Sequence, residues 1–333
     1  MTVDSNENPA QTLTVSETDA GARLDVFIAR ELQVSRERAK QLLKTATLNG
    51  AAAKSSHTLK VGDELILTMD PAVAAREEKP APIREETARL MPPVIFEDEH
   101  LIILNKPRGL VVHEGAGEQG STLVDILRAS GKELSSVGPH ERGGIVHRLD
   151  KDTSGVIAVC KTDAAHWQLA KDFAERRVRK EYSAIVCGVP RSPGRIEAPL
   201  DRHPKNRKKM AVVATGRHAI TEYSVTQSWL KFALLNVNIL TGRTHQIRVH
   251  LAYINAPVVG DVVYGGLNRA LENAPNDAVR EAIENLHGQA LHAAHLSFAH
   301  PITGETLSFY APLPDVISRV VDALDEDKAA GKI

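Results

Sequence analysis

The residue types best suited to chemistry are concentrated in one stretch, residues 142–155, which holds two arginines, a histidine and two carboxylates between flanking glycines. Asp150 lies between Arg148 and Lys151, and the positive field of these neighbours keeps a carboxylate ionised, so that it can act as a nucleophile or a base. An apolar run directly follows, as expected for a loop held against a strand. The alternative is that Asp150 and Asp152 only close a turn, as aspartate often does between elements.

Other kinds of site are less well supported by the residues. His147, His245 and His250 suggest a metal, but only the last two share a predicted helix, five positions apart, where they do not face one way as ligands spaced by four would. Ser154 lacks the glycine-flanked elbow of a serine nucleophile. The two carboxylates of the stretch are two positions apart, whereas glycoside hydrolysis requires a defined separation. One ionised aspartate can act on a sugar centre or a proton without redox chemistry, and the candidates for this are Asp150, Arg148, Tyr182, Arg243 and Arg248.

Charge is segregated along the chain, although the formal net charge is only −1. Residues 142–217 hold 17 Lys or Arg against 8 Asp or Glu, a local net charge of +9. The most basic segment is residues 201–210, and its proline and asparagine predict a flexible arm or hairpin tip suited to binding phosphates. A positive patch on a nearly neutral protein is expected of a phosphate-binding surface, although a run of charge alone is usually a solvated face.

The length of 333 residues favours about two domains. Hydrophobic residues make up 42% of the chain and charged residues 25%, as in ordinary globular proteins. No apolar run approaches the roughly 20 residues that span a bilayer, and the polar, acidic start has no secretory pattern. Cys160 and Cys187 lie inside apolar runs and are predicted to be reduced core residues. We therefore expect a cytoplasmic protein that has no membrane partner.

The N-terminal part is predicted to form a small α/β domain at residues 13–70, after a disordered tail at residues 1–12. Apolar spacing predicts helices over residues 22–32 and 35–45, and alternation predicts a strand over residues 64–69. Three cations spaced by four form a stripe on the second helix, namely Arg36, Lys40 and Lys44. The arrangement resembles the S-four-type RNA-binding module, and the alternative is a small helical domain with a solvated basic face.

A linker is predicted at residues 71–92, where prolines occur among Ala and Glu with little periodicity. The second domain, residues 93–325, is predicted to consist mainly of strands, with helices over about 162–177 and 244–251. Because strands and helices do not alternate regularly, the predicted fold class is α+β, with a mixed, mostly antiparallel sheet. The main strands are expected at residues 101–104, 181–186, 219–228, 232–240 and 291–298.

The central stretch resembles the catalytic-loop motif of the RluA family of pseudouridine synthases over residues 147–155. Three further elements follow in the order of that family: Lys-x-Tyr at 180–182, the run at 242–250, and Gly-Asp-x-x-Tyr-Gly at 260–265. The similarity covers residues 94–312 and implies a pseudouridine synthase catalytic domain.

The resemblance implies isomerisation of uridine to pseudouridine. The bond from the sugar to nitrogen 1 of uracil breaks, the base rotates while held, and carbon 5 bonds to the same sugar carbon, with no cofactor or metal. By motif position, Asp150 is implied to be the catalytic carboxylate, which either attacks the sugar or removes a proton from it. Tyr182 is implied to stack on the base and to take part in proton transfer at carbon 5, and Arg248 to pair with Asp150.

Stacked or duplex RNA hides a base, so the target uridine must be flipped into the site. The resemblance implies that Arg148 fills the vacated stack. The remaining residues expected to contact substrate or RNA phosphates, besides the stripe on the second helix, are His147, Arg243, Arg202, Lys205, Arg207, Lys208 and Lys209.

Within the family, the N-terminal domain and the loop from Arg202 to Pro204 look most like members that act on large-subunit ribosomal RNA. The expected partner is therefore that RNA or its precursor particle, the expected target is the helix 69 stem-loop of the 23S molecule, and the protein is expected to be a monomer. Two alternatives remain: the same chemistry on other ribosomal or transfer RNA uridines, and a non-catalytic RNA-binding assembly factor.

Overall fold

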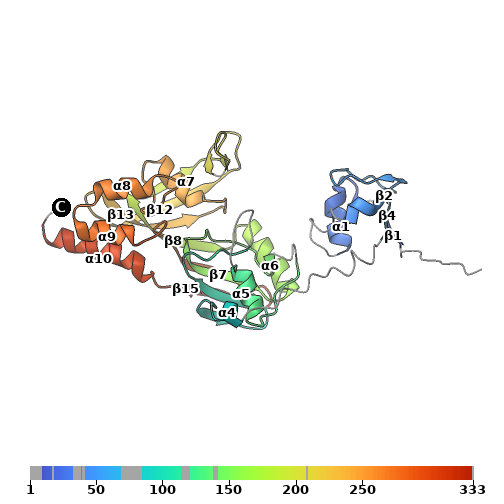
Figure 1. Cartoon of the computed structure of the whole chain (residues 1–333), viewed down its shortest axis with the longest axis horizontal. Helices are drawn as coiled ribbons and strands as arrows, with labels where there is room; N and C mark the ends of the chain where they lie inside the picture. Colours follow the sequence, from blue (N-terminus) through green and yellow to red (C-terminus); the bar gives the residue numbers. More distant parts are fainter. Residues whose placement is uncertain are drawn as a thin grey trace, which may run out of the picture. The chain divides into compact units, whose positions relative to one another are not determined.

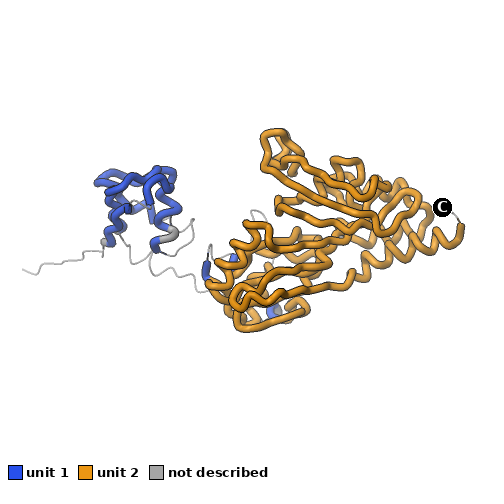
Figure 2. The backbone as a smooth tube through the Cα atoms, turned by 180° about the vertical axis from the view of Figure 1, so that it is seen from behind, with its two compact units in different colours: residues 1–88, 136–143 blue, residues 89–135, 144–333 orange. Residues whose placement is uncertain are grey.

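The computed structural model describes residues 10–16, 19–32, 39, 42–68, 85–113, 121–137, 142–207 and 209–331 (Figure 1). The chain divides into two compact units, residues 1–88 with 136–143 and residues 89–135 with 144–333 (Figure 2). The division after residue 88 falls inside the predicted linker, where the short helix α4 (Glu85–Ala88) lies.

The N-terminal unit is built on a four-stranded antiparallel sheet. Helix α1 (Leu24–Glu31) lies where a helix was predicted, and its residues Leu24, Phe27 and Ile28 are buried in a core of their own. The strands, in their order across the sheet, are β1 (Ala10–Thr14), β4 (Glu64–Thr68), β2 (Ala46–Leu48) and β3 (Ala51–Ala52).

Strand β1 corrects the predicted tail. It begins at Ala10, whereas the tail was predicted to extend through residue 12. The strand pairs with β4 along its whole length, and Leu13 packs against the core of this unit. Gln11 and Thr12 are exposed, and these polar residues gave the segment the composition of a tail in the sequence. Residues 1–9 lie outside the described part of the chain.

The predicted second helix is described only in part. A 3₁₀ turn, η2 (Leu43–Thr45), occupies its end, and Lys44 is exposed there. Two members of the predicted cationic stripe, Arg36 and Lys40, are outside the described residues.

The second unit is organised around one nine-stranded sheet. Every neighbouring pair that the structure describes in this sheet is antiparallel except β7–β14, which is parallel. The sheet is therefore mixed and mostly antiparallel, as predicted. Its strands, in order across the sheet, are β5 (Val94–Glu97), β6 (Leu101–Lys106), β7 (Ser154–Cys160), β14 (Leu291–Ala299), β8 (Arg179–Cys187), β13 (Phe232–Ile239), β12 (Ile220–Ser228) and β9 (Gly194–Glu197), with β15 (Thr306–Tyr310) paired to β14.

Helices pack around this sheet. Thr162 caps α6 by accepting a hydrogen bond from the Ala165 amide. None of the helices in the described ranges is both long and apolar enough to cross a bilayer. The helices of this unit are α5 (Leu123–Ala129), α6 (Asp163–Ala174), α7 (Gln246–Tyr253), α8 (Gly266–Asn273), α9 (Asp277–Glu284) and α10 (Asp315–Ala329).

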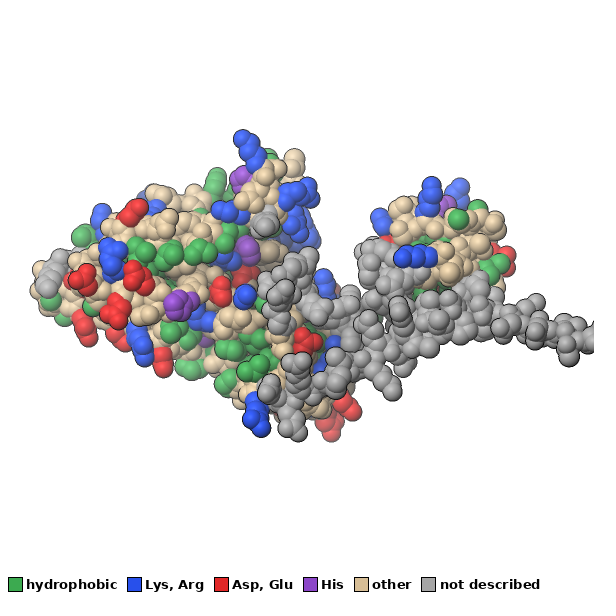
Figure 3. All heavy atoms as spheres, viewed as in Figure 1, with side chains coloured by type: hydrophobic (Ala, Val, Ile, Leu, Met, Phe, Trp, Pro, Cys, Tyr) green, Lys and Arg blue, Asp and Glu red, His purple; other side chains and the backbone are tan. Residues whose placement is uncertain are grey.

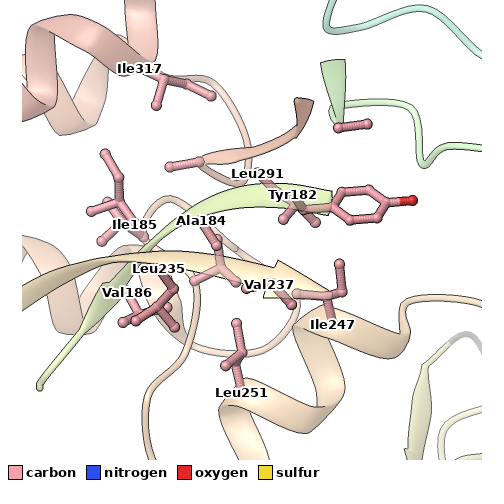
Figure 4. Packing of buried hydrophobic residues seen from close by; sticks show 14 of the residues in the cluster. Tyr182, Ala184, Ile185, Val186, Leu235, Val237, Ile247, Leu251, Leu291 and Ile317 are labelled. Atoms are coloured by element: carbon pink, nitrogen blue, oxygen red, sulfur yellow. The ribbon is translucent and has the colours of Figure 1, made fainter. Parts of the chain in front are cut away.

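The centre of the sheet is buried on both faces, which makes it a rigid platform for a site. All seven residues of β7 are buried, and so are the two cysteines, which are free, as predicted. Ile247 and Leu251 of α7 pack against Val237 on one side of the sheet, while Ile317 of α10 lies on the other side (Figure 4). Tyr182 ends this cluster, and its hydroxyl points out of it.

A two-stranded hairpin carries the most basic segment. Strands β10 (Leu200–Arg202) and β11 (Met210–Val212) pair antiparallel, so the predicted hairpin tip lies at residues 203–209. On the face seen in Figure 3, Lys and Arg side chains gather around this hairpin, while acidic side chains gather over α9 and α10.

Candidate active site

The loop before β7 presents one carboxylate to solvent. Leu149 is buried in the core, whereas Arg148 on its N-terminal side is exposed. The side chain of Asp150 is 18% exposed, and its backbone carbonyl accepts a hydrogen bond from the amide of Thr153 at 3.0 Å. Leu149 therefore anchors the loop while Asp150 stays accessible to a substrate.

Arg248 of α7 connects Asp150 to a second, buried carboxylate. Its Nη1 donates to Asp150 Oδ2 at 3.0 Å, and its Nε and Nη2 donate to the two oxygens of Asp261 at 2.7 and 3.1 Å. The Asp261 side chain is fully buried. Burial alone would lower the pKa of Arg248, but hydrogen bonds and charge from Asp261, and then from Asp150, outweigh it and raise that pKa above its ordinary value. Arg248 thus remains a cation that fixes the orientation of Asp150.

The segment that follows Asp261 completes this support. Asp261 Oδ1 accepts hydrogen bonds from the amides of Val263 and Tyr264, at 2.8 and 3.1 Å. The Tyr264 ring lies 5.2 Å from Arg248 Cζ, a cation–π distance. The sequence indicated this segment as a motif but assigned no role to its residues. The structure shows that Asp261 and Tyr264 hold Arg248.

Tyr182 of β8 is the buried aromatic residue of the site. Only 8% of its surface is exposed. Burial, and then the negative charge of Asp150, raise its pKa above the ordinary value, so its hydroxyl stays protonated at neutral pH. The structure therefore brings together the three residues for which a catalytic role was predicted, Asp150, Tyr182 and Arg248.

Lys106, at the end of β6, was not identified from the sequence, because a lysine before proline in a turn is usually exposed. Its side chain is fully buried, and Nζ donates to the carbonyls of Pro107, Leu110 and Lys151, at 2.8, 2.8 and 3.0 Å. Burial lowers its pKa to about 7, against the opposing charge of Asp152 and then Asp150. Because Lys151 directly follows Asp150, the hydrogen bond from Lys106 to the Lys151 carbonyl holds the backbone next to Asp150.

A second set of contacts holds the part of the loop that follows Asp150, at Asp152 and Thr153. Arg108 donates to the carbonyls of Gln289 and Leu286, at 2.6 and 2.9 Å, and the Gln289 side chain donates to Thr153 Oγ1 at 3.0 Å. Gly288 packs so closely on Asp152 that a Cβ there would lie 2.7 Å from Asp152 Cβ. Asp152 therefore packs against this segment.

The predicted candidates His147 and His250 are engaged within the domain. His147 Nε2 accepts a hydrogen bond from the Ala158 amide at 2.9 Å, and its ring stacks on Phe173 with centroids 4.7 Å apart. Burial, and then the charge of Lys180, lower the pKa of His147 to about 3, so the ring is neutral. The buried His250 ring contacts Thr221 Oγ1 and the Ala198 carbonyl, at 2.8 and 3.0 Å.

The geometry also bears on two alternatives to carboxylate chemistry, a metal site and a serine nucleophile. In the described ranges no group of three or more His, Cys, Asp and Glu side chains is arranged to hold a metal ion. Ser154 Oγ lies 2.9 Å from His292 Nδ1, but both residues are buried, so this serine is not accessible to a substrate.

The remaining candidates lie on the basic side of the unit. Arg243 donates to the His218 carbonyl at 3.3 Å, and burial, followed by the charges of Arg217 and Arg176, lowers its pKa. On the hairpin, Lys209 Nζ donates to the Val263 carbonyl at 2.8 Å. Lys208 is outside the described residues. The side chains of Arg202, Lys205 and Arg207 are exposed.

The site thus consists of a buried arginine that orients a carboxylate next to a buried tyrosine, on a mixed sheet with a basic hairpin. A family model described as RNA pseudouridylate synthase matches residues 100–253. The protein named ribosomal large subunit pseudouridine synthase D of Xanthomonas campestris pv. campestris is 39% identical over 318 residues, which is 95% of this chain and 92% of that protein. The protein of the same name from Vibrio cholerae is 39% identical over 319 residues, 95% of each chain.

A solved structure shows the same fold. Human RNA pseudouridylate synthase domain containing 4 superposes with a TM-score of 0.57 at 27% identity, over 72% of this chain and 96% of that chain. The chain belongs to the RluA family of pseudouridine synthases. It is therefore an enzyme that isomerises uridine to pseudouridine in RNA, and the predicted family, fold class and reaction are confirmed.

Proposed function

We propose that this chain forms pseudouridine in large-subunit (23S) ribosomal RNA, with the helix 69 stem-loop as its target, and that Asp150 is the catalytic carboxylate. The observation that carries the assignment of Asp150 is its pairing with Arg248. That arginine binds only Oδ2, and within the described residues no hydrogen bond reaches Oδ1. Oδ1 is thus the oxygen that attacks the sugar or removes its proton.

Tyr182 stacks on the target uracil and takes part in proton transfer at carbon 5. Its burial next to Asp150 supports this role, because a protonated hydroxyl can donate to the base while the ring contacts its face. The bond to nitrogen 1 breaks, the uracil turns within the site, and carbon 5 bonds to the carbon that nitrogen 1 left.

The exposed cations provide the RNA contacts. Arg148 lies on the solvent side of the same loop as Asp150, so it is placed to fill the stack that the flipped uridine leaves. The hairpin at residues 200–212 carries exposed Arg202, Lys205 and Arg207, which bind backbone phosphates. The N-terminal unit acts as an S-four-type RNA-binding module. The enzyme acts as a monomer in the cytoplasm, on the RNA or on its precursor particle.

The experiment maps pseudouridine across ribosomal and transfer RNA from cells that lack this protein, complemented with wild type or with Asp150→Asn. We expect the modification to disappear at a few large-subunit sites, including helix 69, and to return with wild type alone. Restoration by Asp150→Asn would exclude Asp150 as the catalytic carboxylate. Loss of pseudouridine at transfer RNA sites instead would identify transfer RNA as the substrate. Unchanged maps in every strain would favour an assembly factor over an enzyme with this substrate.

Purified protein separates chemistry from binding. Asp150→Asn should abolish turnover but leave RNA affinity within roughly tenfold of wild type, because phosphate contacts supply most of the affinity. A comparable loss of binding and turnover would mean that Asp150 mainly organises the RNA-binding surface.

A further inference from the structure

A chain of polar contacts ends at Asp150 from the side opposite to its proposed reactive oxygen. His245 precedes α7, and its Nε2 lies 4.0 Å from Asp150 Oδ2. Its Nδ1 lies 2.9 Å from the Tyr264 hydroxyl, and that hydroxyl accepts a hydrogen bond from the Met210 amide at 3.0 Å. Met210 begins β11, so the chain of contacts runs from the basic hairpin to the catalytic loop.

The first link in this chain favours one direction for the others. The Met210 amide can only donate, so it occupies one acceptor position of the Tyr264 oxygen, and the hydroxyl proton is available for donation to His245 Nδ1. Nδ1 is then an acceptor, and the proton of a neutral imidazole must be on Nε2. Nε2 is the atom that faces Asp150.

The surroundings of His245 hold its ring with Nε2 directed at Asp150. His245 is partly buried and adopts a left-handed backbone conformation with φ of 56°, which only a residue fixed by its surroundings retains. The groups that face the ring are the carboxylates of Asp150 and Asp261 and the guanidinium groups of Arg248 and Arg148, besides the Tyr264 hydroxyl. Burial is the main reason that the pKa of His245 is lowered, and the ring is therefore neutral at neutral pH.

We propose that His245 is a positioning residue of the pseudouridine synthase reaction, which presents Nε2–H to Asp150 Oδ2 in the tautomer that Tyr264 selects. The proposal rests on the proposed role of Asp150. Oδ2 then accepts from Arg248 and His245 together, so the carboxylate cannot rotate, and Oδ1 stays directed at the ribose. The 4.0 Å separation closes when RNA occupies the site, as catalytic hydrogen bonds commonly shorten in the substrate complex.

Two replacements of His245 distinguish positioning from packing. Asparagine places an amide near the Nδ1 position, keeps a contact with Tyr264 and tolerates the left-handed backbone, but cannot reach Asp150. Glutamine reaches the Nε2 position and can donate there. Both lose the imidazole ring, so neither keeps the ring packing of wild type, and only glutamine can still donate near Asp150.

We expect His245→Asn to lower kcat roughly tenfold to a hundredfold, as expected for a lost hydrogen bond to a charged group, with KM for RNA within about threefold. His245→Gln should retain kcat within about fivefold of wild type. The assay uses the full chain and an RNA stem-loop on which wild type forms pseudouridine. Equal losses in the two variants, or an effect on KM alone, would overturn the proposal.

The tautomer can be measured without any turnover. In the full chain labelled with ¹⁵N-histidine, long-range ¹H–¹⁵N spectra distinguish a protonated Nε2 from a protonated Nδ1, and the His245 signals are those missing from His245→Asn. We expect Nε2–H in wild type, and a mixture of both tautomers in Tyr264→Phe, which keeps the ring beside Arg248 but lacks the hydroxyl. Nδ1–H or an imidazolium ion in wild type at neutral pH would overturn the proposal.

A failure of the His245 proposal can be distinguished from a failure of the proposed function. If wild type modifies another RNA, the spectra and the ratio of the two variants keep their meaning on that substrate. If Asp150→Asn retains turnover, the assignment of Asp150 fails, and with it the reason for His245 to act, whatever the tautomer.

Discussion

Arg248 joins two carboxylates with different environments, one accessible and one buried. Asp150 is part of the accessible loop, whereas Asp261 is fully buried and makes two hydrogen bonds to the guanidinium group. Removing one partner of a buried pair is more costly than removing both, because the remaining charge has no solvation. Arg248 therefore contributes to stability through Asp261 and orients Asp150 through a separate hydrogen bond.

Replacing Arg248 therefore has two separable effects. Arg248→Met should lower the free energy of unfolding by about 3 kcal/mol or more, because it leaves Asp261 charged and buried. In the double variant Arg248→Met with Asp261→Asn, the neutral amide still accepts from the Val263 and Tyr264 backbone, so most of the stability should return while turnover stays lost. Urea unfolding and a pseudouridine assay measure the two effects. Equal stability of the single and double variants would contradict this account of Asp261.

Lys106 predicts a dependence of stability on pH. Its pKa is lowered from 10.5 to about 7, so between these values the unfolded chain binds more protons at this position than the folded chain does. This contribution therefore stabilises the fold progressively as the pH rises from about 7 to about 10. The difference in unfolding free energy between wild type and Lys106→Met should grow in favour of wild type over that interval, as measured by urea unfolding at several pH values. A difference independent of pH would show that Lys106 stays charged within its three carbonyls.

The site was predictable from sequence where a residue type and its neighbours restrict the chemistry. Asp150 was identified from its charged neighbours, whereas the roles of Tyr182 and Arg248 were predicted from the resemblance to the family, and Arg248 is indeed bonded to Asp150 although 98 positions separate them. Lys106, Asp261 and Tyr264 act through burial and through bonds to backbone groups distant in sequence. A sequence does not show which lysine or aspartate will be enclosed, so their roles required the fold.

Elements were predictable where their residues alternate or repeat clearly. Helices α6 and α7 and the central strands lie where they were expected, because each has one apolar face or is entirely buried. Strand β1 was missed because its exposed residues are polar. The place of β14 between β7 and β8 has no local sequence pattern, since it depends on pairing between segments far apart in the chain.

The contact between the segment before β14 and the loop that carries Asp150 and Asp152 gives a prediction at this scale. Gly288→Ala should lower kcat at least tenfold, because the new Cβ would lie 2.7 Å from Asp152 Cβ and the loop must move. Gly304→Ala is the matched control: it also has a left-handed backbone, with φ of 77°, but no atom lies within 4 Å of its added Cβ. Both variants should lose some thermal stability, and only Gly288→Ala should lose turnover. Equal kinetic effects would show that backbone strain alone is responsible.

Charge is separated on the face of the second unit seen in Figure 3, although the net charge of the chain is only −1. Cations gather around the hairpin at residues 200–212, and acidic side chains cover α9 and α10 (Figure 3). This distribution favours one orientation of an RNA polyanion and repels it from the acidic end. Binding should therefore depend strongly on salt through a small set of residues.

Replacing Lys205 and Arg207 with alanine should weaken RNA binding and reduce the slope of log affinity against log salt by about 1 for each cation removed. Replacing Lys231 and Arg319, exposed cations outside the hairpin, removes the same charge and is the control. Affinities measured between about 50 and 200 mM salt give the slopes. The same change in slope for both pairs would indicate a general charge effect without a role for the hairpin.

The position of β14 also determines how late during synthesis of the chain the central sheet can be completed. Strands β5, β6 and β7, with Asp150, form one half of the sheet, and β8, β13, β12 and β9, with Tyr182, form the other. Among the described strands, only β14 pairs with both halves, and it ends at residue 299. Until that residue has left the ribosome exit tunnel, the nascent chain carries two unjoined halves of an active site. A truncated product released before this point, for example from a damaged message, would contain Asp150 and Arg248 but would lack the strand that pairs with both halves of the sheet.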